Sequence, residues 1–177
     1  MKSRFRLAGA TIAFGWLATV AGAQQTLTQP LKAINDWYVH IYESGDVKEC
    51  FVSSIPKRSV NTRGGKEVQV RRGVTQISVT FRPKEGVTGE VSFTGGYPYD
   101  PKSTVKLSVG GTTFDLYVDG EWAWTSGPDA DEKIHEAFRR GATATVVGRS
   151  SRGTTTRDSI SLIGFTAAMT EAKKLCT

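Results

Sequence analysis

Side chains suited to catalysis are scarce in this chain. Acid–base, nucleophilic and zinc chemistry most often use histidine, and the sequence holds only His40 and His135. His40 lies on the polar face of a predicted strand and His135 on a predicted helix, so we expect both at the surface, outside any catalytic constellation. The motifs H-E-x-x-H, G-x-S-x-G, the P-loop and G-x-G-x-x-G are absent. The sequence therefore predicts no enzyme and no cofactor or metal site.

A serine-rich segment is the one stretch that suggests a nucleophile. It runs S-S-R-G-T over residues 150–154, with Asp158 close by. A nucleophilic serine needs a base within hydrogen-bond reach, and no histidine lies nearby in the sequence. We interpret the segment as a polar turn.

Basic residues gather in one segment, residues 57–72, which holds a single acid, Glu67. They are Lys57, Arg58, Arg63, Lys66, Arg71 and Arg72. Such a patch could hold lipopolysaccharide, a sulfated glycan, acidic lipid or nucleic acid. The alternative, which we favour, is a solvated edge strand protected by charge. Aromatic residues do not interleave with the charges, which argues against stacked bases and so against nucleic acid.

Aromatic residues suggest a second binding surface. Tyr97, Tyr99 and Asp100 lie in a loop punctuated by glycine and proline, and aromatic rings on rigid loops commonly bind sugars or proteins. Trp122 and Trp124 share one face of a predicted strand, which we assign to the core. The tyrosine loop is therefore the candidate binding loop.

The two cysteines, Cys50 and Cys176, predict a disulfide if the chain is exported to an oxidising compartment. The bond would tether the C-terminus to an early strand. A redox dithiol would instead place the cysteines close together as C-x-x-C, which is absent.

The N-terminal residues have the pattern of a secretory signal peptide. Three basic residues, Lys2, Arg4 and Arg6, precede an apolar stretch over 7–20 and the triplet Ala21-Gly22-Ala23. The apolar stretch is shorter than the roughly 20 residues of a membrane span. Cleavage after Ala23 would leave residues 24–177, beginning at Gln24, and would lower the formal charge from +6 to +3. We expect a periplasmic, outer-surface or secreted protein with no membrane span.

Alternation of apolar and polar residues with period two predicts a mainly β, antiparallel, β-sandwich-like single domain over residues 24–177. The clearest part is a three-stranded meander over 105–109, 114–118 and 122–124, with turns at Gly110-Gly111 and Asp119-Gly120. Two further strands are expected over 142–148 and 155–163. Two short helices are expected at about 129–140, started by a capping box of Asp129 and Glu132, and at about 166–175.

Together these pieces resemble the invasion-associated locus B family of exported bacterial proteins. The matching residues are Asp36-Trp37, Cys50-Phe51-Val52 with Ser54 and Pro56, Arg82-Pro83, Gly96-Tyr97-Pro98, Phe114 to Tyr117, Ala123-Trp124, Ser151 to Thr154, Asp158, Ser161-Leu162, Gly164-Phe165 and Cys176. Many members carry a further cysteine shortly after the first tryptophan, where this chain has His40 to Glu43. The resemblance implies a compact, non-enzymatic β-sandwich-like domain in the periplasm or at the outer surface of a Gram-negative bacterium, an alphaproteobacterium.

Two functions from different classes follow. The first is an exported, non-catalytic interaction protein for host-cell contact or envelope upkeep, with an unidentified protein, envelope or host-surface partner and a polyanion contact. The second is a periplasmic binder of a small ligand or glycan that uses the tyrosine loop. A hydrolase comes third. A deep apolar pocket with converging polar groups would favour the ligand binder, and a flat patch would favour a larger partner.

Overall fold

The computed structural model describes residues 29–176, so the predicted signal peptide lies outside the described residues. Within them, the strands form one antiparallel sheet in the order β1-β2-β3-β6-β7-β10-β9-β8-β11-β12-β4-β5. The strands are β1 (Lys32–Ile34), β2 (Trp37–Ser44), β3 (Val47–Ser54), β4 (Arg58–Arg63), β5 (Lys66–Glu67), β6 (Gln76–Arg82), β7 (Val87–Thr94), β8 (Thr104–Val109), β9 (Thr112–Asp119), β10 (Trp122–Trp124), β11 (Thr143–Arg149) and β12 (Thr155–Ser161). The helices are the short 3-10 helix η1 (Pro83–Glu85), α1 (Pro128–Arg140) and α2 (Phe165–Leu175). Of the helices described, none is both long and apolar enough to cross a membrane.

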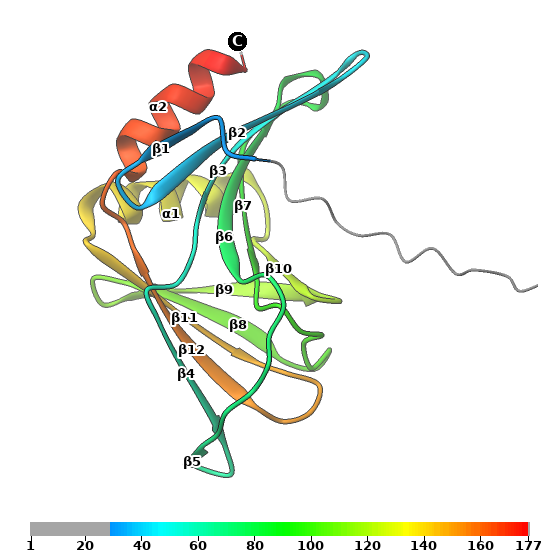
Figure 1. The fold of residues 1–177 in the computed structure, drawn as a ribbon, viewed down its shortest axis with the longest axis vertical. Coiled ribbons are helices and arrows are strands. Elements are labelled where there is room, and N and C mark those ends of the chain that lie inside the picture. The colour runs from blue at the N-terminus through cyan, green and yellow to red at the C-terminus, as the bar shows by residue number, and fades with distance from the viewer. Residues whose placement is uncertain (1–28, 177) are drawn as a thin grey trace, which may run out of the picture.

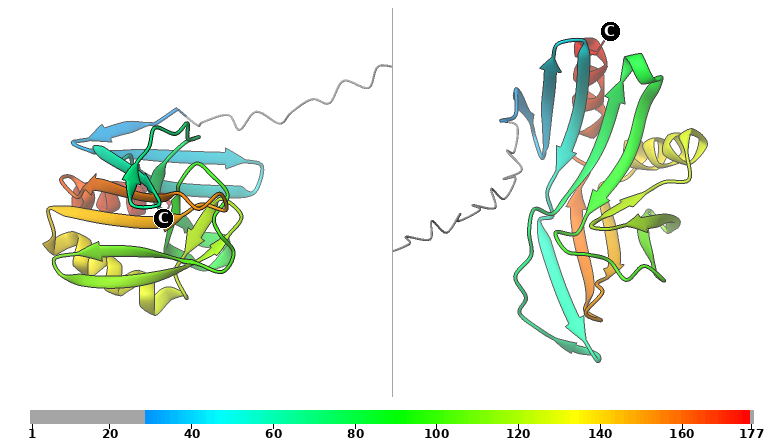
Figure 2. Two further views of the ribbon diagram at one scale, coloured as in Figure 1. Left: turned by 90° about the horizontal axis from the view of Figure 1, so that it is seen from below. Right: turned by 90° about the vertical axis from the view of Figure 1, so that its right-hand side faces the viewer.

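The sheet is strongly twisted, and the helices cover only part of it (Figure 1). α2 packs against β2 and β3, and α1 packs against β7. The β4–β5 hairpin lies at the end of the molecule far from α2 (Figure 2). One cluster of buried residues joins the inward side chains of the strands to both helices, with Trp37, Phe138 and Phe165 in mutual ring contact.

The predicted mainly β, antiparallel fold with two short helices is confirmed. The strands form a single bent sheet, because each strand is hydrogen-bonded to its neighbours in the order given above. The meander is confirmed as β8, β9 and β10, and Gly110 and Gly111 take φ angles of 54° and 86° in its first turn. The second turn lies one residue later than expected, at Gly120-Glu121, because Asp119 pairs with Trp122.

Two local expectations are wrong. The predicted capping box at Asp129 does not form, since α1 begins after Gly127 with Pro128 in its first turn and no side-chain cap bond. Trp122 and Trp124 do share a face, but it is the half-buried outer face, and Ala123 between them is fully buried. Ala123 faces the core because it pairs with the buried Phe93 of β7.

The predicted disulfide is present between Cys50 of β3 and Cys176 at the end of α2. Both cysteines are buried, with 0% and 8% exposure. The bond closes a sequence separation of 126 residues. It therefore fixes the end of α2 against β3, the third strand in the sheet order, and links residues that are far apart in the sequence.

We expect replacement of both cysteines by serine to lower the free energy of unfolding by about 3–5 kcal/mol. The bond closes a long loop, so it lowers the conformational entropy of the unfolded chain. Urea unfolding of the oxidised protein and the double variant measures this difference. Equal unfolding midpoints would show that the bond contributes nothing to stability.

Candidate functional site

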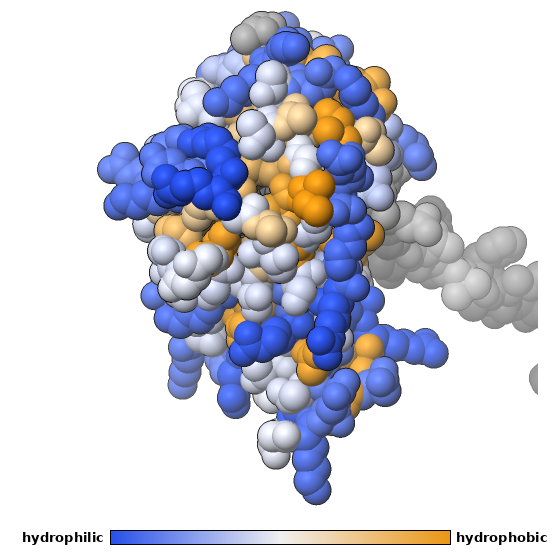
Figure 3. All heavy atoms as spheres, turned by 90° about the vertical axis from the view of Figure 1, so that its left-hand side faces the viewer, coloured by the Kyte–Doolittle hydropathy of each residue, from blue (hydrophilic) through white to orange (hydrophobic). Residues whose placement is uncertain are grey.

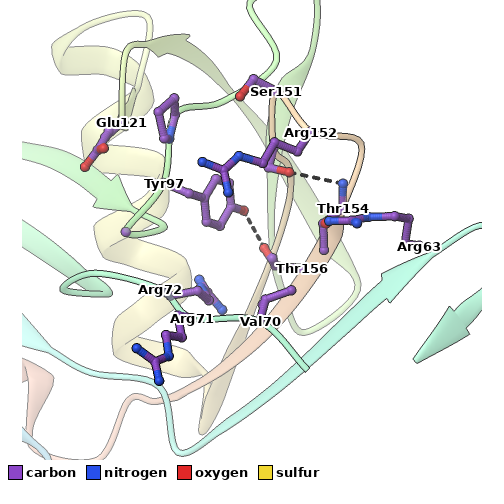
Figure 4. Close-up of a pocket in the computed structure, with 13 residues that line it drawn as sticks. Arg63, Val70, Arg71, Arg72, Tyr97, Glu121, Ser151, Arg152, Thr154 and Thr156 are labelled. Atoms are coloured by element: carbon purple, nitrogen blue, oxygen red, sulfur yellow. Dashed lines mark hydrogen bonds between the residues drawn. The ribbon is translucent and has the colours of Figure 1, made fainter. Parts of the chain in front are cut away.

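A cavity of about 190 Å³ opens where three connections meet, away from α2. These are the segment between β5 and β6, the loop after β7, and the turn between β11 and β12. We call it the arginine pocket. Its charged and aromatic lining consists of Arg63, Arg71, Arg72, Arg152, Glu121 and Tyr97 (Figure 4).

A buried ion pair anchors this pocket. Two nitrogens of the Arg72 guanidinium each donate to one oxygen of Asp158, both at 2.7 Å. The Asp158 carboxylate is fully buried on β12 and also accepts a hydrogen bond from Ser59 of β4 at 2.6 Å. Burial opposes the charge on Arg72, but the bonds to Asp158 outweigh it and hold the arginine's pKa above its ordinary value. The charge of Arg72 is therefore already matched within the protein.

Two glycines bring the β5–β6 segment against the loop after β7. The Gly73 amide donates to the Gly96 carbonyl at 2.8 Å. Gly96 has φ +70°, and a β-carbon there would come within 2.6 Å of the Gly73 carbonyl oxygen. Only glycine allows this approach, which places Arg72 beside the tyrosine loop.

Tyr97 lies near the centre of the arginines in Figure 4. Its hydroxyl group is 2.5 Å from that of Thr156, and the Arg72 guanidinium carbon lies 5.3 Å from its ring centre. Burial raises the pKa of the Tyr97 phenol, so it stays neutral. The tyrosine thus offers a ring surface and no negative charge.

The other three arginines keep unmatched charges. Arg63 donates to the Thr154 hydroxyl at 2.7 Å, and Arg71 and Arg152 are exposed. Across residues 29–176, none of these three forms an ion pair with a carboxylate. Guanidinium groups bind carboxylate, phosphate and sulfate through paired N–H bonds. The pocket is therefore suited to an anionic group.

The structure brings together half of the predicted basic patch. Arg63, Arg71 and Arg72 line the pocket, while Lys57, Arg58 and Lys66 do not. Lys57 instead pairs with Asp36 at 2.6 Å. Arg58 and Arg63 are five residues apart on β4, and alternation along a strand puts them on opposite faces.

The predicted tyrosine loop is divided in the same way. Tyr97 lines the arginine pocket, whereas Tyr99 is only 4% exposed and packs edge-on against Tyr97 with ring centres 5.0 Å apart. Asp100 lies 3.5 Å from Arg149 as a surface ion pair. The loop therefore contributes one ring to the site, and the expected second exposed ring belongs to the core.

Sequence reasoning named Arg152 and Asp158 only within a segment interpreted as a polar turn, and did not assign them to a binding site. Asp158 occupies an inward position of β12, between the buried Thr156 and Ile160. A carboxylate at an inward strand position needs a cationic partner. The alternation along residues 155–161 could therefore have indicated a buried ion pair at Asp158.

The expectation that both histidines lie at the surface is wrong. His40 is 8% exposed, stacks on Phe51 with ring centres 4.3 Å apart and is 3.0 Å from the Ser53 hydroxyl. His135 is 4% exposed because the buried stripe of α1 runs through Asp131, Ile134, His135 and Phe138. Neither histidine lines the arginine pocket.

Comparison with known proteins identifies a family and a similar solved structure. A family model described as "Invasion associated locus B (IalB) protein" matches residues 65–173. The crystal structure of invasion associated protein B from Bartonella henselae is similar, with a TM-score of 0.56, 16% identity, and coverage of 85% of this chain and 97% of that chain. At this identity the structural likeness supports the fold. No curated protein matches the sequence.

The ion pair generates a stability prediction. Asp158→Asn keeps the shape of the side chain but leaves Arg72 as a buried charge without its counterion. We expect a loss of about 3 kcal/mol or more in the free energy of unfolding, measured by urea unfolding. Arg71→Gln, an exposed neighbour, should stay within about 0.5 kcal/mol. A similar, small effect of both substitutions would contradict the anchoring role of the pair.

Proposed function

The chain belongs to the invasion-associated locus B family, and we propose that it is an exported, non-catalytic interaction protein that holds an anionic group of its partner in the arginine pocket. The partner is a component of the bacterial envelope or of a host surface. Carboxylate, phosphate and sulfate share the required chemistry.

One observation carries this proposal: three arginines without an ion-pair partner line one cavity beside a neutral tyrosine ring. Like charges held together repel one another, and an anion between them relieves that repulsion. The fourth arginine, Arg72, is fixed by Asp158 and supports the wall of the pocket. This wall is therefore fixed before a ligand arrives, which lowers the ordering cost of binding.

The size of the pocket favours one anionic group of a larger partner over a complete small-molecule ligand. Pockets for drug-sized ligands typically enclose about 300–1,000 Å³, while the arginine pocket encloses about 190 Å³. Figure 3 shows the side on which α1 and α2 lie, where hydrophobic residues gather in small patches between hydrophilic ones. Large apolar patches mark many protein interfaces, and the face in Figure 3 shows only small ones.

A small-ligand or glycan binder remains the second candidate, because Tyr97 lines the same cavity as the arginines. An aromatic ring can pack against the apolar face of a sugar while a guanidinium holds an acidic substituent. A sulfated or uronic-acid-containing glycan would be a suitable ligand under both proposed functions.

The absence of catalysis in this proposal is supported by the groups that line the pocket. They are guanidiniums, which do not lose their protons in proteins, a phenol whose pKa is raised by burial and one carboxylate, Glu121, with no histidine among the lining residues. General acid–base catalysis needs groups that titrate near the working pH.

The anion site can be tested by titrating the mature protein with short heparin fragments and with lipopolysaccharide. If three guanidiniums each release a counterion, affinity should fall roughly 40-fold between about 50 and 200 mM salt. The double variant Arg71→Gln/Arg152→Gln should bind more weakly at low salt and lose about two of the three units of salt slope.

The matched control is Arg58→Gln/Lys66→Gln, which removes the same charge from basic residues outside the pocket. It should keep the wild-type salt slope. Equal weakening of both double variants would show that only the overall field attracts polyanions, and the pocket would lose its assigned role.

Export predicts a defined mature species. When the full chain is expressed in a Gram-negative host, the periplasmic protein should begin at Gln24 and carry the Cys50–Cys176 bond. Intact-mass measurement with and without reductant checks both features. An uncleaved N-terminus, or two free thiols in the periplasmic protein, would contradict the proposed location.

A further inference from the structure

A second cavity, of about 400 Å³, lies between η1, the beginning of β7 and the first turns of α1. We call it the acidic pocket. Its titratable lining consists of Glu85, Glu90, Asp131, Glu132, His135 and Tyr117. No lysine or arginine is among the described residues that line it, so its charge is opposite to that of the arginine pocket.

Carboxylates outnumber the cations around this pocket. Arg82 lies behind one wall and is shared among three glutamates: it donates to Glu85 at 2.9 Å and to Glu90 at 2.8 Å, and lies 3.7 Å from Glu49. One guanidinium cannot neutralise three carboxylates. This wall therefore keeps a net negative charge.

The opposite wall adds a carboxylate that has no cation. Glu132 is paired with Arg139 at 2.6 Å. The residue before it, Asp131, lies in the buried stripe of α1 and pairs with no arginine or lysine among the described residues. Its Oδ1 atom accepts hydrogen bonds from the Val91 amide at 2.9 Å and the Thr125 hydroxyl at 2.7 Å. Burial raises the pKa of Asp131 more than these two hydrogen bonds lower it.

His135 adds a buried ring nitrogen, Nε2, that accepts no hydrogen bond from the described residues. Its Nδ1 atom lies 3.3 Å from Glu132, while Nε2 is buried without a hydrogen-bond partner in the structure described. Burial lowers the pKa of His135, so the ring is neutral at neutral pH. With the Nδ1 hydrogen donated to Glu132, Nε2 presents a lone pair. The ring lies over Gly89, where a β-carbon would come within 2.7 Å of Cε1.

We propose that the acidic pocket binds a primary ammonium group. Such a group brings a positive charge and three N–H donors, and the pocket offers excess carboxylates and a buried lone pair in need of a donor. The rim carries Tyr117, which is 54% exposed, and an aromatic face attracts a cation. Among the described residues, no group of three or more histidine, cysteine, aspartate or glutamate side chains could hold a metal ion.

The ammonium group can come from a small free amine or from a lysine side chain of a partner protein. The volume of about 400 Å³ falls within the usual range for small ligands and also admits an extended lysine side chain. Calorimetric titration with cadaverine and with Nα-acetyl-lysine amide separates the two sources. Pentanol, which has a similar chain without the charge, is the control probe and should not bind.

The test variant is Asp131→Asn, which keeps an oxygen for the Val91 and Thr125 hydrogen bonds and removes the charge. We expect it to weaken amine binding about tenfold or more. Asp129→Asn is the matched control, since it removes the same charge from the same helix at a residue that does not line the pocket. It should weaken binding less than about twofold, because exposed charges are screened by salt.

A second readout on the wild-type protein keeps the test decisive if Asp131→Asn does not fold. Amine binding should shift the nitrogen NMR signal of His135 Nε2 as its lone pair accepts a hydrogen bond, and should leave the His40 signals unchanged. Saturable binding of cadaverine alone would identify a small amine, and equal binding of the lysine amide would identify a lysine side chain. Absence of saturable binding, equal weakening by both variants, or an unshifted His135 signal would overturn the proposal.

Discussion

The ion pair between Arg72 and Asp158 is the interaction on which the proposed anion site depends. It joins the irregular segment after β5 to the interior of β12, and through Ser59 it also reaches β4. Because the carboxylate is fully buried, neither partner can lose the other without leaving a buried charge. The pair therefore fixes the path of the chain beside Tyr97 and, with it, the position of the exposed Arg71. The arginines line a pocket because one of them, Arg72, points inward and binds the buried Asp158.

Local patterns in the sequence were enough to predict much of the fold. Alternation and the Gly110-Gly111 turn identified the meander, and apolar stripes located both helices to within a residue at their ends. Alternation placed Trp122 and Trp124 on one face but could not say which face is buried, because that depends on β7 and β9 on either side. His135 was misplaced for a related reason: the buried stripe of α1 is wide enough to include polar residues, which find space over Gly89 and the start of β7.

The candidate site could be predicted only in part, since its residues meet through the sheet order. Arg72 and Asp158 are 86 residues apart, and their contact requires β12 to pair with β4, which no local pattern reveals. The basic segment was found by composition, but the division of its members between pocket and surface depends on the Gly73–Gly96 contact and on strand alternation. The described residues thus form two cavities of opposite charge, the arginine pocket and the acidic pocket.

The central claim is that an anionic group seats among Arg63, Arg71 and Arg152 beside Tyr97. The most direct measurement is NMR of the arginine side-chain N–H groups of the mature protein during titration with a sulfated disaccharide. We expect saturable shifts for these three arginines and for the Tyr97 ring, with the signals of Arg139 and Arg140 of α1 unchanged. Shifts of similar size across all exposed arginines, or shifts that leave the arginine pocket untouched, would contradict it.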